Sequence, residues 1–251
     1  MTRADWILRP ILWFVTASTI TVLLHEGAHA LTAFALGLPP TLYQYYVDWP
    51  QENATLAQQA AIHTGGPTVS LLVGLCCWLA YRRMKPSAAG LPLLYLAAFG
   101  VAMFFGHLMS AAFTGDFSGV LRWLELPMPA RYAISAIGAA GTAAVMFWLG
   151  RQLREWIPAE AGKAFGVIGV VVAPIIIGTA IILLINQPVP PCPPFVSSRL
   201  SQAGLGMFTL LGAARPGAST AVRSFRLWWI DGTIAIAAVL IVRILVFGIT
   251  L

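Results

Sequence analysis

The sequence contains few charged residues. Only 10% of its 251 residues are Asp, Glu, Lys or Arg, and 59% are hydrophobic, whereas an ordinary soluble domain is about 25% charged. Nine acidic and fifteen basic side chains cannot cover the surface of a water-soluble globule. The composition also excludes a disordered chain, a coiled coil and a nucleic-acid-binding domain. With a mean hydropathy of +0.81, the class that is left is a polytopic protein of the lipid bilayer.

Cysteine and lysine are scarce as well. The three cysteines are Cys76, Cys77 and Cys192, two of them adjacent and none in a C-x-x-C pair, so no disulfide framework is indicated. Thirteen of the fifteen basic residues are Arg, and most lie between apolar runs, where they set the orientation of membrane helices. The Arg-rich, Ala-rich composition favours a multi-pass protein of a prokaryotic cytoplasmic (inner) membrane.

Long hydrophobic runs predict an all-α fold, a polytopic transmembrane helix bundle with about six spans. A helix needs about 20 apolar residues to cross the hydrocarbon core, and lipid offers no partners for an open backbone. The spans are expected at roughly Ile11–Leu38, Ala60–Tyr81, Leu91–Phe113, Tyr132–Leu149, Ala164–Ile185 and Trp228–Phe247. For the first span, a signal peptide cleaved near residue 30 is the less favoured alternative.

The loops add two expectations. The segment Thr41–Trp49 is aromatic and β-prone, which predicts a short β-hairpin or re-entrant loop between spans one and two, or else an interfacial aromatic belt. The loop at 186–227 is Pro-rich at its start, yet it contains four Arg residues on a side that the span count makes external. An extra re-entrant or spanning piece near Gly204–Ala214 would explain this.

The first span contains His25-Glu26-Gly27-Ala28-His29, an H-E-x-x-H motif. The i, i+4 spacing places both imidazoles on one face of a helix, where they can share one metal ion. Glu26 is the candidate base that takes a proton from a metal-bound water and returns it to a leaving amine. Gly27 is expected to let another backbone approach closely. The alternative is a polar cluster that holds helices together.

Two further motifs lie near the ends of predicted spans. In His63-Thr64-Gly65-Gly66-Pro67, which opens the second span, Pro67 suits the first turn of a helix, and free amides there could face a substrate carbonyl. A simple helix-start signal is the alternative. In Thr114-Gly115-Asp116-Phe117-Ser118-Gly119, the carboxylate of Asp116 could be the third metal ligand, or it could cap a turn outside the bilayer.

The predicted topology brings these motifs together. Successive spans run in opposite directions, so the end of span one, the start of span two and the end of span three share one side of the membrane. His25, His29, His63 and Asp116 are therefore expected on that side. His107 lies about 13 Å from Asp116 if the helix continues, and is expected to be a packed or hydrogen-bonded side chain and not a ligand of the same metal.

At these residues the chain resembles the site-2 protease family of intramembrane zinc metalloproteases, over about Ile11–Trp123. The resemblance rests on the H-E-x-x-H motif followed by Ala30, on Gly66-Pro67 with Ser70 three residues later, and on Asp116 near a glycine. The family more often has Asp-Gly where this chain has Asp116-Phe117-Ser118-Gly119, and often Asn in place of Ser70.

The resemblance implies a zinc site and a way of presenting the substrate. It implies that His25, His29 and Asp116 bind Zn²⁺ and that Glu26 is catalytic. A re-entrant β-loop presents the substrate in that family, which gives the Thr41–Trp49 segment this role. The residues expected to contact the substrate are Gly65, Gly66, Pro67, Ser70 and Tyr45.

The expected organisation is a metalloprotease-like core at residues 1–125, followed by further transmembrane helices at 126–251 with a Pro-rich loop at 186–203. The leading function is that of an intramembrane zinc endopeptidase acting in or near transmembrane segments of other membrane proteins. The alternatives are a zinc-dependent hydrolase of a lipid or small amide, and a non-catalytic scaffold or transporter component. The resemblance implies a site open to the cytoplasm, whereas Arg82, Arg83 and Lys85 put that side outside, so sidedness is left open.

Overall fold

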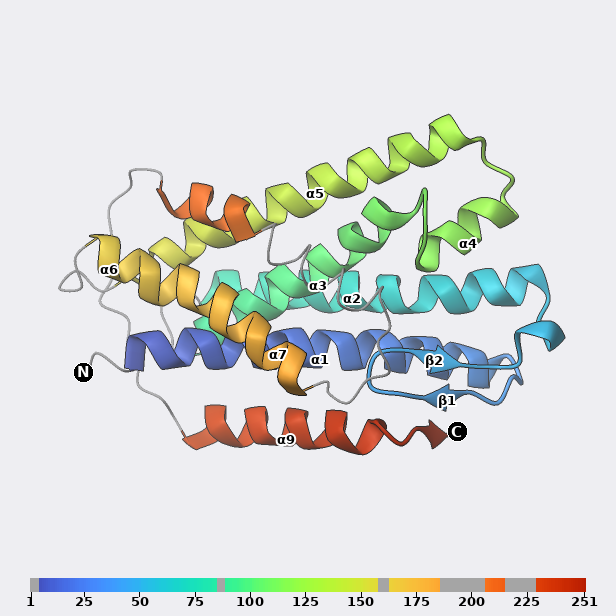
Figure 1. Cartoon of the computed structure of the whole chain (residues 1–251), viewed down its shortest axis with the longest axis horizontal. Coiled ribbons are helices and arrows are strands. Elements are labelled where there is room, and N and C mark those ends of the chain that lie inside the picture. The colour runs from blue at the N-terminus through green and yellow to red at the C-terminus, as the bar shows by residue number, and fades with distance from the viewer. Residues whose placement is uncertain (1–4, 85–88, 158–162, 186–205, 215–228) are drawn as a thin grey trace.

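The computed structural model describes residues 5–84, 89–157, 163–185, 206–214 and 229–251. Their architecture is an all-α helix bundle with one small three-stranded sheet at one end (Figure 1). The predicted fold class is therefore confirmed. Among the described residues, five helices are long and apolar enough to cross a membrane: α1 (Asp5–Ala35), α2 (Leu56–Met84), α3 (Gly90–Ser110), α5 (Met128–Arg154) and the run Ala164–Ile185.

The fifth of these helices is irregular. It comprises α6 (Lys163–Val167), two π-helical stretches (Ile168–Val172 and Pro174–Gly178) and α7 (Thr179–Ile185). Pro174 lacks the N–H that a regular helix needs at this point, which accounts for a local change of hydrogen-bond pattern. The sixth expected span corresponds to α9 (Trp229–Leu245), which has only 17 residues. Residues 206–214 are helical, within the region of the expected extra piece, while the Pro-rich loop at 186–203 lies outside the described residues.

Aromatic packing joins the first and third helices inside the bundle. The ring of Phe14 on α1 lies edge-on to Tyr95 and Phe99 on α3, with centroid distances of 6.2 and 5.0 Å. Such edge-to-face pairs are favourable arrangements of buried rings. Helix α3 also packs against α2 and α5, so it lies at the centre of the bundle. Large apolar side chains such as Ile176 and Ile236 are exposed on the outside, as lipid-facing positions require.

The first loop forms the predicted hairpin. Strands β1 (Thr41–Leu42) and β2 (Val47–Asp48) are antiparallel, with Thr41 opposite Asp48. A third strand, β3 (Ile249–Thr250), pairs with the other edge of β1, so the strand order is β2-β1-β3. This third strand follows α9 and was not predicted. It matters because a two-stranded hairpin alone is only marginally stable.

A buried ion pair joins α1 to α9. Arg9 Nε lies 2.7 Å from Asp231 Oδ2, and the two side chains are only 1% and 7% exposed. Charges at this degree of burial persist only when they are paired. The pair lies near the N-terminal ends of both helices, and the sheet lies at their C-terminal ends (Figure 1).

The direction of the helices confirms the predicted topology. The end of α1, the start of α2, the end of α3 and the start of α5 all meet at the end of the bundle that bears the sheet (Figure 1). Helix α4 (Asp116–Trp123) lies at this same end. The basic residues Arg82, Arg83 and Arg151 belong to the last turns of α2 and α5, at the opposite end.

Candidate metal centre

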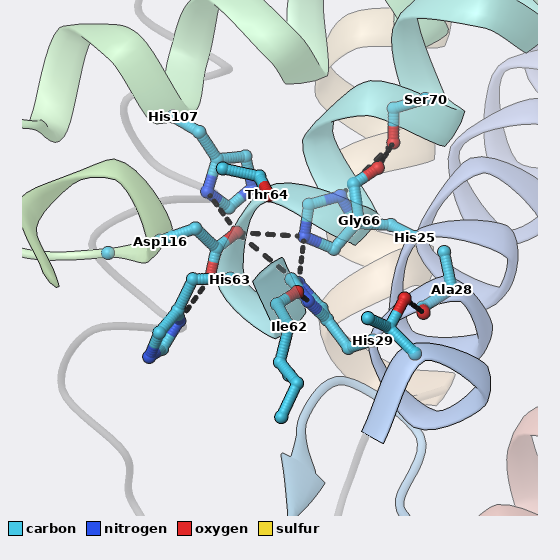
Figure 2. Close-up of polar contacts among 12 residues, drawn as sticks. His25, Ala28, His29, Ile62, His63, Thr64, Gly66, Ser70, His107 and Asp116 are labelled. Carbon is cyan, nitrogen blue, oxygen red and sulfur yellow. Dashed lines mark hydrogen bonds and ion pairs between the residues drawn. The ribbon is translucent and has the colours of Figure 1, made fainter. Parts of the chain in front are cut away.

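All four histidines of the chain surround the carboxylate of Asp116 (Figure 2). Three imidazole nitrogens lie close to its Oδ2 atom: His107 Nδ1 at 2.9 Å, His25 Nε2 at 3.1 Å and His29 Nε2 at 3.4 Å. The fourth, His63 Nδ1, lies 3.5 Å from Oδ1. The prediction that His25, His29, His63 and Asp116 share one side of the bundle is thereby confirmed.

The H-E-x-x-H motif directs both of its imidazoles to one point. His25 and His29 are one helical turn apart in α1, and their Nε2 atoms are 3.0 Å from each other. Their rings are nearly perpendicular, with centroids 4.6 Å apart. Both side chains are buried. This is the arrangement that the i, i+4 spacing predicts.

The outer nitrogen of each ring lies beside a hydrogen-bond acceptor. His29 Nδ1 lies 2.6 Å from the carbonyl oxygen of Ile62, and a carbonyl only accepts, so Nδ1–H donates. The Ser70 hydroxyl donates to the carbonyl oxygen of Gly66, so its oxygen accepts from His25 Nδ1–H at 3.1 Å. A neutral imidazole with its proton on Nδ1 presents an unprotonated Nε2, which is the form that binds a metal.

Three atoms that can bind a metal therefore face one another. His25 Nε2, His29 Nε2 and Asp116 Oδ2 form a triangle with sides of 3.0, 3.1 and 3.4 Å. When both imidazoles are neutral with the proton on Nδ1, a cation satisfies all three atoms at once. Tetrahedral zinc with bonds of about 2.0–2.1 Å separates its ligand atoms by about 3.3 Å. Two imidazole nitrogens and a carboxylate oxygen at this spacing fit Zn²⁺.

Burial and charge also favour a cation. Burial alone would raise the pKa of the Asp116 carboxyl, but the charge of His107 and the hydrogen bond from it outweigh this and hold the pKa well below its usual range. The carboxylate is therefore the ionised form that a metal ligand requires. The expected third ligand, Asp116, is thus an anion placed beside the Nε2 atoms of His25 and His29.

A tight turn returns Asp116 to the histidines. Helix α3 ends at Ser110, and the chain reverses before α4 begins at Asp116. Gly115 has a φ of +86°, a conformation that glycine adopts without strain. The expectation that His107 lies about 13 Å from Asp116 is therefore wrong, because the helix does not continue between them. His107 is a residue of this site that the sequence analysis set aside.

The Gly65-Gly66-Pro67 motif does not open a helix. Helix α2 begins at Leu56, and Pro67 lies buried in its interior, so the prediction of free amides facing a substrate is wrong. Within lipid no water is available to bond to the backbone, so a helix interrupted by a proline keeps its remaining hydrogen bonds. Near this interruption, the Ile62 carbonyl accepts the hydrogen bond from His29 Nδ1.

Gly66 leaves space for the imidazoles. A Cβ atom on this residue would lie 2.8 Å from His25 Nε2 and 2.7 Å from His29 Cε1, which is closer than van der Waals contact. Gly66 therefore leaves room for the imidazoles of His25 and His29 in the candidate metal centre. Ser70, another expected substrate contact, is 1% exposed and bonded on both sides, and it holds His25 in place.

The remaining predicted residues lie around this cluster. Glu26 is half-buried and close enough to His29 for a Coulombic interaction. A Cβ on Gly27 would meet no atom within 4 Å, so the expected close backbone approach there is wrong. Tyr45 lies in the connection between β1 and β2, with its ring 5.3 Å from that of Tyr46, and its contact with a substrate stays a prediction.

The hairpin lies directly beside the site. Trp49, which follows β2, has its ring 5.3 Å from the ring of His63. Val47 and Trp49 belong to the same buried cluster as Ile62, whose carbonyl holds His29. The β2 side of the sheet is therefore the side next to the histidines.

Comparison of the chain with protein-family models, curated proteins and solved structures gives no match.

Proposed function

We propose that this protein is an intramembrane zinc endopeptidase. The observation that carries the proposal is the convergence of two imidazole nitrogens and one carboxylate oxygen, all within 3.4 Å of one another, in a helix bundle suited to a membrane. Two imidazole nitrogens and an ionised carboxylate at this spacing form a set of ligands that suits zinc. Ionisable groups at membrane depth are costly, and they mark functional sites. The resemblance to the site-2 protease family supports the same reading.

The residues have separate roles in the proposed reaction. His25, His29 and Asp116 would hold zinc, which would supply Lewis-acid chemistry to the scissile peptide bond. Glu26 would accept a proton from a water molecule as the water oxygen attacks the peptide carbonyl carbon. The C–N bond then breaks, and Glu26 returns the proton to the departing amine. Ser70 and the Ile62 carbonyl keep the imidazole rings in position.

The neighbouring sheet favours a peptide substrate over a lipid. A transmembrane helix hides its carbonyls in hydrogen bonds, so a segment must be extended before it is cut. Among the described residues, the outer edge of β2 has no strand partner, and it lies on the side of Trp49 and His63. An extended segment could pair there through its main chain. A lipid or small amide gains nothing from a strand edge.

Two measurements on the same preparation test the proposal. Metal analysis of protein purified without chelators should give about one zinc per chain, and Glu26→Gln should retain it. In proteoliposomes with a set of single-span peptides, with products identified by mass spectrometry, Glu26→Gln should lower cleavage by about 10²–10⁴-fold. Cleavage by this variant at the wild-type rate would falsify the mechanism, and lipid products without peptide products would favour the lipid hydrolase.

A further inference from the structure

The position of His107 suggests more than hydrogen bonding to Asp116. Its Nδ1 atom lies 2.9 Å from Asp116 Oδ2, closer than either imidazole of the H-E-x-x-H motif. The candidate ligand atoms of His25, His107 and Asp116 all lie within 4.8 Å of one another. The His107 ring also stacks on that of His25, with centroids 4.4 Å apart and planes 18° apart. Two donor sets thus share His25 and Asp116: one is completed by His29, the other by His107.

We propose that His107 is a fourth protein ligand, which binds zinc together with His25, His29 and Asp116. This inference rests on the zinc site of the proposed function. The Nδ1 atom, which faces Asp116 Oδ2, would be the one that binds the metal. The result is a three-histidine, one-carboxylate site. Closed four-ligand sites of this kind hold metal, whereas catalytic sites keep one position for water.

The location of His107 makes it the ligand that can leave. Its side chain is 24% exposed, against 3% for His25, and it lies one turn before the end of α3 at Ser110. His25 and His29, in contrast, are held on their far side by Ser70 and the Ile62 carbonyl. Departure of His107 from the metal would open a position for water. The enzyme would then have a resting state and an open state that differ in this one bond.

His63 provides a matched control. It also lies beside Asp116, but its Nδ1 is 3.5 Å from the other carboxylate oxygen, Oδ1. Its side chain is 29% exposed, similar to that of His107. A phenylalanine at either position keeps a ring and removes both nitrogens. His107→Phe and His63→Phe therefore differ in whether a proposed zinc donor is lost.

X-ray absorption at the zinc edge, on the full-length zinc-loaded protein, counts the imidazoles around the metal. We expect three in the wild type, three in His63→Phe and two in His107→Phe, with zinc affinity at least about tenfold weaker in the last. Two imidazoles in the zinc-bound wild type would overturn the role of His107 and leave the proposed function intact. The wild-type count decides the matter even if His107→Phe does not fold. A wild type without zinc would instead overturn the proposed function itself.

Discussion

Replacement of Gly66 by Ala is a direct test of the candidate metal centre, because it adds one carbon atom where the imidazoles of His25 and His29 converge. The new Cβ would lie 2.8 Å from His25 Nε2 and 2.7 Å from His29 Cε1. Both backbones belong to long helices, so the rings must give way. Overpacking of this kind costs about 1–3 kcal/mol. If the strain falls on the metal-binding arrangement, zinc affinity should fall by about 5- to 150-fold.

Competition with a chromophoric chelator measures this affinity in detergent-solubilised protein. Gly27→Ala is the matched control, because it adds the same atom to the H-E-x-x-H segment, where a Cβ meets nothing within 4 Å. It should leave zinc affinity unchanged within about twofold and favour the helix slightly. If Gly66→Ala binds zinc as tightly as the wild type does, the three acceptor atoms are not the zinc site, and the reasoning from their convergence fails.

Other perturbations test the supports of the site and of the bundle. Ser70→Ala leaves His25 Nδ1–H without its acceptor and should weaken zinc binding by about 10–100-fold in the same titration. Thr142→Ala, which removes a hydroxyl that donates to the Gly138 carbonyl within α5, should leave zinc binding unchanged. Arg9→Leu leaves the buried carboxylate of Asp231 unpaired and should lower stability against thermal or detergent-induced unfolding by about 3–5 kcal/mol. The double replacement of Arg9 and Asp231 by Leu should recover most of that lost stability. If the double variant is no more stable than Arg9→Leu, loss of the ion pair is not the cause of the destabilisation.

Much of the fold and the core of the site follow from local rules. Hydropathy predicts the spans because lipid admits only helices of sufficient apolar length. The four-residue spacing predicts the shared face of His25 and His29, and the alternation of span directions predicts that Asp116 lies on their side. Each of these inferences needs only the period of a helix or the thickness of a bilayer.

The missed features depend on where the chain turns and on pairings between distant residues. The reversal at Gly115 brings His107 to Asp116, and no spacing along a continuous helix could show it. The Gly-Gly-Pro motif reads locally as a helix start, yet α2 begins at Leu56. Thr55 and Gln58 cap this start, because each backbone N–H donates to the side-chain oxygen of the other residue. The partners Arg9 and Asp231 are 222 residues apart, so only the folded bundle reveals that the two charges compensate each other.

The attachment of α9 has a mechanical consequence. Near its start this helix is bound to α1 through the Asp231–Arg9 pair, and beyond its end β3 is hydrogen-bonded to the hairpin that follows α1. The two attachments lie at opposite ends of α9 (Figure 1). Separation of α9 from α1 along its whole length therefore requires both the ion pair and the strand pairing to break.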